Sequence, residues 1–260
     1  MTTKQLLQES LRIYSEQYAK AYLLEAGFCD YEADGRNWYK LENGIIKHVH
    51  FFCLPALALH PMIAYGAHPI YLPAPVPGPL YPRVYTSMEY SEEVMRPCLE
   101  RGTRVSLTLP NGIPALVPDP DHPMAGPLVG LALPTLEKVT DARSAFELHK
   151  RQIRDRILQH PGDYSLEERA GLYSEDYLLE ASMLGAGQED PLYLLRAQQL
   201  LTDAERQGAK EAELVLLQQI VFSLLDGPTE GLLAIVSKRE AREKKRLLKK
   251  LPQLVNPSLC

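Results

Sequence analysis

The sequence predicts an α+β protein: an N-terminal helix and an antiparallel β-meander sheet, followed by an all-helical C-terminal region. Two hairpin-forming dipeptides, one Asp-Gly and one Asn-Gly, lie close together near the start of the chain. Sixteen of the 21 prolines lie between Pro55 and Pro134, where they interrupt long elements. After Asp141 the apolar residues follow helical spacing, and strands followed by helices are typical of α+β folds.

The first helix is expected at residues 3–26. Gly27 supplies the left-handed stop, and Phe28 stands where a helix end of the Schellman type makes its apolar contact. Apolar and aromatic residues recur at steps of three and four and predict one buried face, made of Leu7, Leu11, Tyr14, Tyr18 and Tyr22.

The meander is expected at residues 28–54. Asp34-Gly35 and Asn43-Gly44 are both favoured two-residue hairpin turns. They separate three segments with strand character, at 28–33, 36–42 and 45–54.

The proline-rich residues 55–134 are expected to form loops and strands that are short, bulged or at a sheet edge, with strands at 83–90 and 103–109 and a short helix at 91–101. Helices follow at 141–160, 165–185, 190–206, 209–226 and 229–251, separated by glycine and proline. A division near Pro161 predicts two domains, an α+β domain over 1–160 and a helical bundle over 162–260.

Two-residue loops at both hairpins fix the cross-strand pairing and therefore the two faces of the meander. Trp38 falls on an apolar face, which we expect to lie on the core. The opposite face carries two cross-strand rows of polar side chains, Asp30–Tyr39–His48 and Glu32–Asn37–His50.

That polar face is the candidate ligand or metal site, because histidines at i and i+2 of one strand are able to share a metal ion. One histidine oriented by a carboxylate is also suited to acid–base chemistry. A polar ligand pocket and a solvated sheet face are the other interpretations of the same pattern. A slip of one residue in either hairpin would separate the rows.

The formal net charge of −5 is unevenly distributed along the chain. Residues 238–250 carry eight basic and two acidic side chains, and all other residues together carry 20 basic and 31 acidic side chains. The basic residues are Lys238, Arg239, Arg242, Lys244, Lys245, Arg246, Lys249 and Lys250. They are interpreted as a solvated or intramolecular surface, a contact for a partner protein, or a contact for nucleic-acid phosphates.

The helix expected at 229–251 contains these basic residues. It is expected to pack on the rest of the protein through a line of small and apolar residues, namely Ala234, Ala241, Leu248 and Leu251.

The remaining patterns concern compartment and cofactors. Four widely spaced cysteines, no signal-peptide pattern and no long apolar run predict a cytoplasmic protein with reduced thiols and no membrane contact. The familiar phosphate-loop, dinucleotide, hydrolase and zinc motifs are absent from the sequence, so no cofactor is expected.

A resemblance rests on GF at 27–28, GRNWYK at 35–40, NG at 43–44 and IIKHVHFF at 45–52. With the helix before them, these segments resemble a family of bacterial domains of unknown function, over about residues 5–155. The resemblance implies the same helix-and-meander fold and supplies no activity or catalytic residue.

Together these patterns predict a binding protein of the bacterial cytoplasm. Its C-terminal helices are expected to form a platform for another protein or for self-association. The alternatives are an enzyme or metal site that uses His48 and His50 with Asp30 or Glu32, and a nucleic-acid-associated protein that uses residues 238–250.

Overall fold

The structure is a computed structural model that describes residues 15–30, 35–53, 61–72, 104–108, 114–118, 128–159 and 165–250. The first part of the predicted N-terminal helix, the predicted strand at 83–90 and the predicted helix at 91–101 lie outside these residues.

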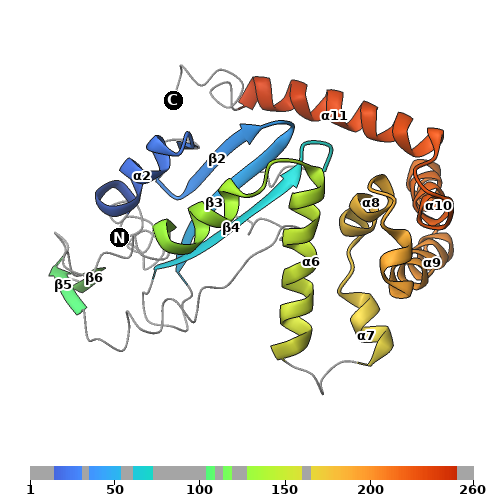
Figure 1. Cartoon of the computed structure of the whole chain (residues 1–260), viewed down its shortest axis with the longest axis horizontal. Helices are drawn as coiled ribbons and strands as arrows, with labels where there is room; N and C mark the ends of the chain where they lie inside the picture. Colours follow the sequence, from blue (N-terminus) through green and yellow to red (C-terminus); the bar gives the residue numbers. More distant parts are fainter. Residues whose placement is uncertain are drawn as a thin grey trace. The chain divides into compact units, whose positions relative to one another are not determined.

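One four-stranded sheet contains β1 (Cys29–Asp30), β2 (Asn37–Glu42), β3 (Ile45–Cys53) and β4 (Pro61–Pro69), paired in that order (Figure 1). With the helices described below, it confirms the α+β class. β4 falls within the proline-rich region and lies at the edge of the sheet, which is one of the positions expected for strands there. Its prolines occupy the first and last positions, so neither interrupts the ladder between them.

A separate two-stranded sheet pairs β5 (Arg104–Thr108) with β6 (Pro114–Pro118). β5 confirms the strand predicted at 103–109. β6 was not predicted, and it too has proline only at its ends, opposite the ends of β5.

The N-terminal helix begins, within the described residues, with a π-helical turn, η1 (Ser15–Ala19), and continues as α2 (Lys20–Glu25). The π turn inserts one extra residue, which rotates the following residues around the axis. Ala19 and Leu23 are therefore buried and Tyr22 is exposed, so the predicted face was wrong at its last position.

The end of α2 is the predicted Schellman motif. Phe28 N–H donates to the Leu23 carbonyl over 2.8 Å, and Gly27 N–H donates to the Leu24 carbonyl over 2.9 Å. Gly27 has a φ of 79°, which a residue with a side chain rarely adopts.

The second hairpin has the predicted register. Asn43 and Gly44 both have positive φ, as a type I′ turn requires, and Trp38 pairs with Val49. Trp38 is buried, and its indole N–H donates to the Gly35 carbonyl over 3.0 Å. Its side chain therefore lies in the core of the sheet unit, as predicted.

The last part of the proline-rich region forms a second π turn, η4 (Leu128–Ala132), followed by α5 (Leu133–Glu137). Neither was predicted, because Pro134 suggested an interruption. Pro134 is instead the second residue of α5, which directly follows the π turn.

The helical part of the chain contains α6 (Ala142–Gln159), α7 (Leu166–Gly171), α8 (Glu175–Met183), the 3₁₀ turn η5 (Gly187–Glu189), α9 (Pro191–Arg206), α10 (Glu211–Asp226) and α11 (Glu230–Lys250). The single helix predicted at 165–185 is divided. Ser174 caps a new helix there, since its side chain accepts a hydrogen bond from Tyr177 N–H.

The described residues divide into two compact units. The sheet unit contains those up to Ala67, those at 104–140 and those after Arg246, and the helical unit contains 68–72 and 141–246. This division differs from the predicted one because α6 belongs to the helical unit. The core of that unit includes Phe146 of α6.

No helix within the described ranges combines the length and the apolar character needed to cross a membrane.

Candidate functional site

The two histidines of β3 lie on one face of the sheet, as predicted. Tyr39 pairs with His48, and Asn37 pairs with His50. The Nδ1 atom of His50 lies 2.6 Å from Oδ1 of Asn37, and the Tyr39 and His48 rings are 6.3 Å apart between centroids. The second hairpin therefore brings together four of the six predicted residues.

The carboxylates do not join them as predicted. In the first hairpin Asp30 pairs with Trp38, and Cys29 pairs with Tyr39, one residue away from the predicted register. Both carboxylate oxygens of Asp30 accept the N–H of Gly35, at 2.9 and 3.1 Å, so this side chain closes the turn. The predicted row Asp30–Tyr39–His48 is wrong, and Glu32 lies outside the described residues.

Cys29, which takes the place predicted for Asp30 opposite Tyr39, is disulfide-bonded. The expectation of reduced thiols was therefore wrong at this position. It was based on the wide spacing of cysteines in the sequence, and sequence spacing does not determine their distance in a fold.

His48 is 4% exposed. Burial, with a smaller contribution from the nearby His50, lowers the pKa of His48 to about 3. The imidazole is therefore neutral near pH 7 and lacks the pKa of a general acid–base group. Among the residues that the structure describes, no group of three or more His, Cys, Asp or Glu side chains is arranged to hold a metal ion.

A cluster of buried polar groups that the sequence analysis missed lies in the helical unit. Nδ1 of His149 in α6 lies 3.0 Å from a carboxyl oxygen of Glu180 in α8, and the His149 ring meets the edge of Tyr177 at 4.9 Å between centroids. Glu180 is fully buried, and burial raises its pKa against the opposing effect of His149.

A second carboxyl of α8, Asp176, belongs to the same cluster. Asp176 is 8% exposed. The pKa of Asp176 is raised to about 6: burial is the largest cause, Glu175 and Glu180 also raise it, and Arg239 and His149 lower it. A carboxyl with this pKa changes charge near neutral pH.

Three tyrosines complete the cluster. The hydroxyl groups of Tyr177 and Tyr193 lie 2.8 Å apart, and the Tyr173 hydroxyl donates to Asp190 over 2.7 Å. Asp190 also caps α9 by accepting the N–H of Leu192 over 2.8 Å. Burial raises the pKa of Tyr193 to about 12, so its hydroxyl keeps its proton and serves as a hydrogen-bonding link between helices.

The basic segment of α11 is partly neutralised within the chain. Arg239 lies 3.7 Å from Glu175 of α8. Within α11, Lys244 lies 2.6 Å from Glu240, and Arg246 lies 2.7 Å from Glu243. These three predicted residues therefore make intramolecular contacts.

The other predicted basic residues differ. Lys238, Arg242, Lys245 and Lys249 are exposed, although Arg242 lies 3.6 Å from Glu243. The side chain of Lys250 lies outside the described part of the chain. The predicted docking side was wrong at Ala234 and Ala241, which are exposed, and the buried residues among the described side chains of α11 are Leu232, Val236 and Glu243. The side chains of Leu248 and Leu251 lie outside the described part of the chain.

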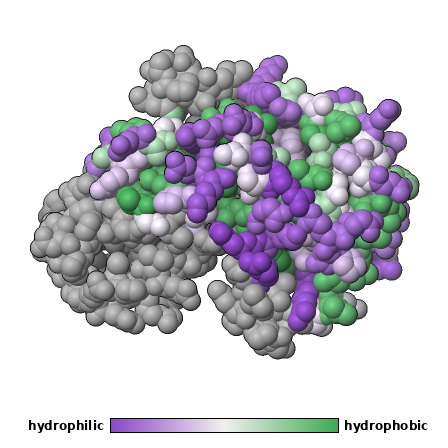
Figure 2. Space-filling model, in the orientation of Figure 1, coloured by the Kyte–Doolittle hydropathy of each residue, from purple (hydrophilic) through white to green (hydrophobic). Residues whose placement is uncertain are grey.

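The outer face of α10 is unusually apolar. Its buried side carries Leu216, Leu217, Ile220 and Leu224. On the opposite side Val215, Phe222 and Leu225 are exposed, with Phe222 at 52%. In Figure 2 apolar residues reach the surface at the edge where Figure 1 places α9 and α10.

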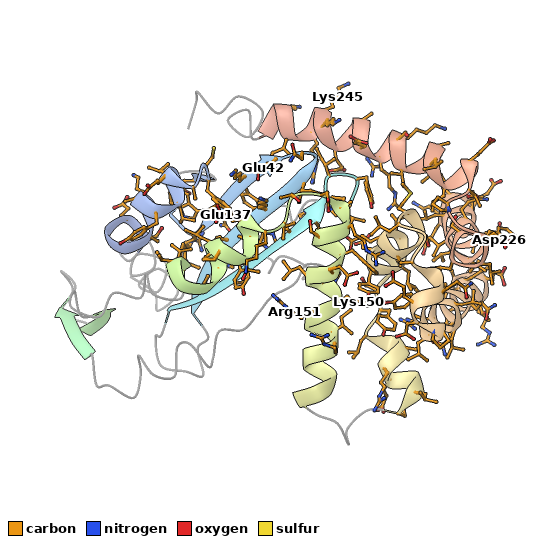
Figure 3. The ribbon with its side chains drawn as sticks, viewed as in Figure 1. Glu42, Glu137, Lys150, Arg151, Asp226 and Lys245 are labelled. Carbon is orange, nitrogen blue, oxygen red and sulfur yellow. The ribbon has the colours of Figure 1, made fainter. Side chains whose placement is uncertain are left out.

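Two carboxylates stand at the ends of this apolar row. Glu211 and Asp226, the first and last residues of α10, are exposed and share the sector of Val215 and Phe222. Asp226 projects from the end of the helix in Figure 3. We call Glu211, Val215, Gln218, Phe222, Leu225 and Asp226 the α10 outer face.

Comparisons with protein-family models, with curated proteins and with solved structures give no match. The resemblance to the bacterial domain family therefore stays a prediction.

Proposed function

We propose that the chain is a non-catalytic binding protein whose helical unit receives an amphipathic helix of a partner protein on the α10 outer face. The observation that supports this most is the exposure of Phe222 between Val215 and Leu225 on one side of one helix. Single exposed apolar residues are common, but an aligned row with polar ends is typical of helix-binding surfaces.

The charges at the ends of the row define the partner. A carboxylate at the last position of a helix opposes the helix dipole, so Asp226 does not stabilise α10. Together with Glu211 it places one negative charge at each end of a row about 22 Å long. A partner helix with apolar residues in its middle and Lys or Arg at both ends complements that pattern.

The same charges disfavour a second copy of this chain on this face. Antiparallel copies of α10 would bring Glu211 next to Asp226, and parallel copies would bring each carboxylate next to its own equivalent. Both arrangements place like charges together, which disfavours association.

Two designed helical peptides test the proposal. Both carry the same apolar row, and one has Lys at both ends whereas the other has Glu. We expect the Lys-ended peptide to bind the full chain at least tenfold more tightly in isothermal titration calorimetry. Phe222→Ser should weaken its binding about 30-fold, the value of one buried aromatic side chain of about 2 kcal/mol.

Gln207→Ser, at an exposed position after α9, is the matched control and should leave the affinity unchanged. The proposal would be refuted if the two peptides bound with equal affinity. It would also be refuted if the Phe222→Ser variant bound the Lys-ended peptide as tightly as the original chain does. Dimers in analytical ultracentrifugation that Phe222→Ser abolishes would show that the face binds a second copy instead.

A further inference from the structure

The exposed side of α11 carries a line of cations. Lys238, Arg242, Lys245 and Lys249 follow at steps of four, three and four, so their side chains leave the helix within one narrow sector. At 1.5 Å per residue the line is about 17 Å long. Lys245 projects from the outer side of the helix in Figure 3.

These cations are distinct from the basic residues that stabilise the fold. Within the described part of the chain, Lys238, Lys245 and Lys249 form no ion pair at up to 4.0 Å, and Arg242 is 73% exposed beside Glu243. Because the rest of the chain carries an excess of acidic side chains, this line is a concentrated positive surface on an acidic protein.

Another side of α11 is occupied by folding contacts. Leu232 and Val236 are buried, about a third of a turn away from the cations. An amphipathic helix that binds a membrane needs its apolar side free to enter the lipid. α11 does not offer that side, so a lipid surface is a poor match for the line.

We propose that this line binds the phosphate backbone of a nucleic-acid duplex without reading its sequence. Phosphates of one strand follow every 3.4 Å along a B-form duplex, so a line of about 17 Å runs beside roughly five of them. Single-strand binding uses aromatic side chains on which bases stack, and α11 contains none. A duplex carries twice the charge per length of a single strand, and binding to its phosphates requires only cations.

The test is fluorescence anisotropy of the full chain with labelled DNA and RNA duplexes of one length, over a series of salt concentrations. Four phosphate contacts predict a slope of about −3.6 for log K against log salt. The double substitution Arg242→Gln and Lys245→Gln should halve the slope and weaken binding about 60-fold at 0.1 M salt. If the chain binds one duplex more tightly than the other, that preference shows whether the line fits the DNA backbone or the RNA backbone.

The matched control is Arg206→Gln with Lys210→Gln, which removes two exposed charges elsewhere on the helical unit. It should leave the affinity within about twofold of the original. Circular dichroism checks that each variant is folded, and Lys238→Gln with Lys249→Gln provides a second pair on the line.

The proposal is independent of the α10 outer face, and Phe222→Ser should not affect duplex binding. No duplex binding at low salt would overturn it, as would equal losses from the line and control variants. Vesicles rich in anionic lipid and polyglutamate are the competing probes. If either binds the line as tightly as the duplexes do, the line recognises negative charge in general, and the assignment to nucleic acid is wrong.

Discussion

Replacing Asp176 by Asn should stabilise the helical unit at neutral pH. The carboxyl is 8% exposed, and its pKa is raised from 3.8 to about 6. Each pKa unit corresponds to 1.36 kcal/mol, so ionising Asp176 in the folded protein costs about 3 kcal/mol more than in the unfolded chain. Asn has the same shape and no charge, so it removes that cost.

The sign follows from proton binding. Between about pH 4 and pH 6 the folded protein holds the proton of Asp176 more tightly than the unfolded chain does. The free energy of unfolding of the original protein therefore falls as the pH rises through this range. The variant lacks this loss, so its advantage should be near zero at pH 4 and about 2–3 kcal/mol at pH 7.5. The favourable placement of a carboxylate in the first turn of α8 reduces the gain by about 0.5 kcal/mol.

Urea unfolding at both pH values measures this difference. Near-ultraviolet circular dichroism of the packed tyrosines, such as Tyr177 and Tyr193, follows the helical unit. Trp38 is the single tryptophan and lies in the sheet unit, so its fluorescence is an internal control. Asp203→Asn, at an exposed position, should have no pH-dependent effect. The reasoning would be refuted if the Asp176→Asn variant were no more stable than the original protein at pH 7.5. It would also be refuted if the variant were more stable by the same amount at both pH values.

Three other perturbations have defined outcomes. His149→Leu leaves the buried carboxyl of Glu180 without its hydrogen-bonding partner and should lower the free energy of unfolding at pH 7 by about 2 kcal/mol, as urea unfolding would show. Glu180→Gln in the same chain should restore part of that loss. Gly187→Ala would press a methyl group into the backbone of α10 and should lower the melting temperature, whereas Gly171→Ala meets open space and should not. Because Cys29 is disulfide-bonded, thiol titration of the denatured, unreduced chain should find at most two of the four cysteines, and four after reduction.

The two hairpins show when sequence is sufficient to determine pairing. Asn43-Gly44 is a complete turn by itself, and the register of Tyr39 with His48 followed from it correctly. At the first hairpin the side chain of Asp30 accepts the Gly35 N–H, and Asp30 pairs with Trp38 instead of Tyr39. One residue of slip was enough to move Asp30 away from the histidines.

The polar cluster of the helical unit shows the opposite limit. His149 and Glu180 are 31 residues apart and come from different helices, so no local pattern connects them. Only the packing of α6 against α8 buries both, and packing between helices is not encoded in the spacing of either one.

Helix α11 combines both cases. Its extent and its basic character followed from the sequence, but the docking side did not. Ala234 and Ala241 of the predicted line are exposed, whereas the structure buries Leu232 and Val236 together with the charged Glu243. An acidic residue becomes tolerable on the buried side because Arg246 pairs with it at 2.7 Å.

A photo-crosslinking amino acid at Phe222 of the full chain, in cells that produce it naturally, tests most directly whether the α10 outer face binds a partner. We predict one adduct with another protein, formed from position 222 and from Val215 but not from Gln207. Glu211→Lys with Asp226→Lys should abolish it, because the partner's basic ends lose their complement. An adduct of two copies of this chain, equal crosslinking from Gln207, or no adduct would contradict the proposed binding site.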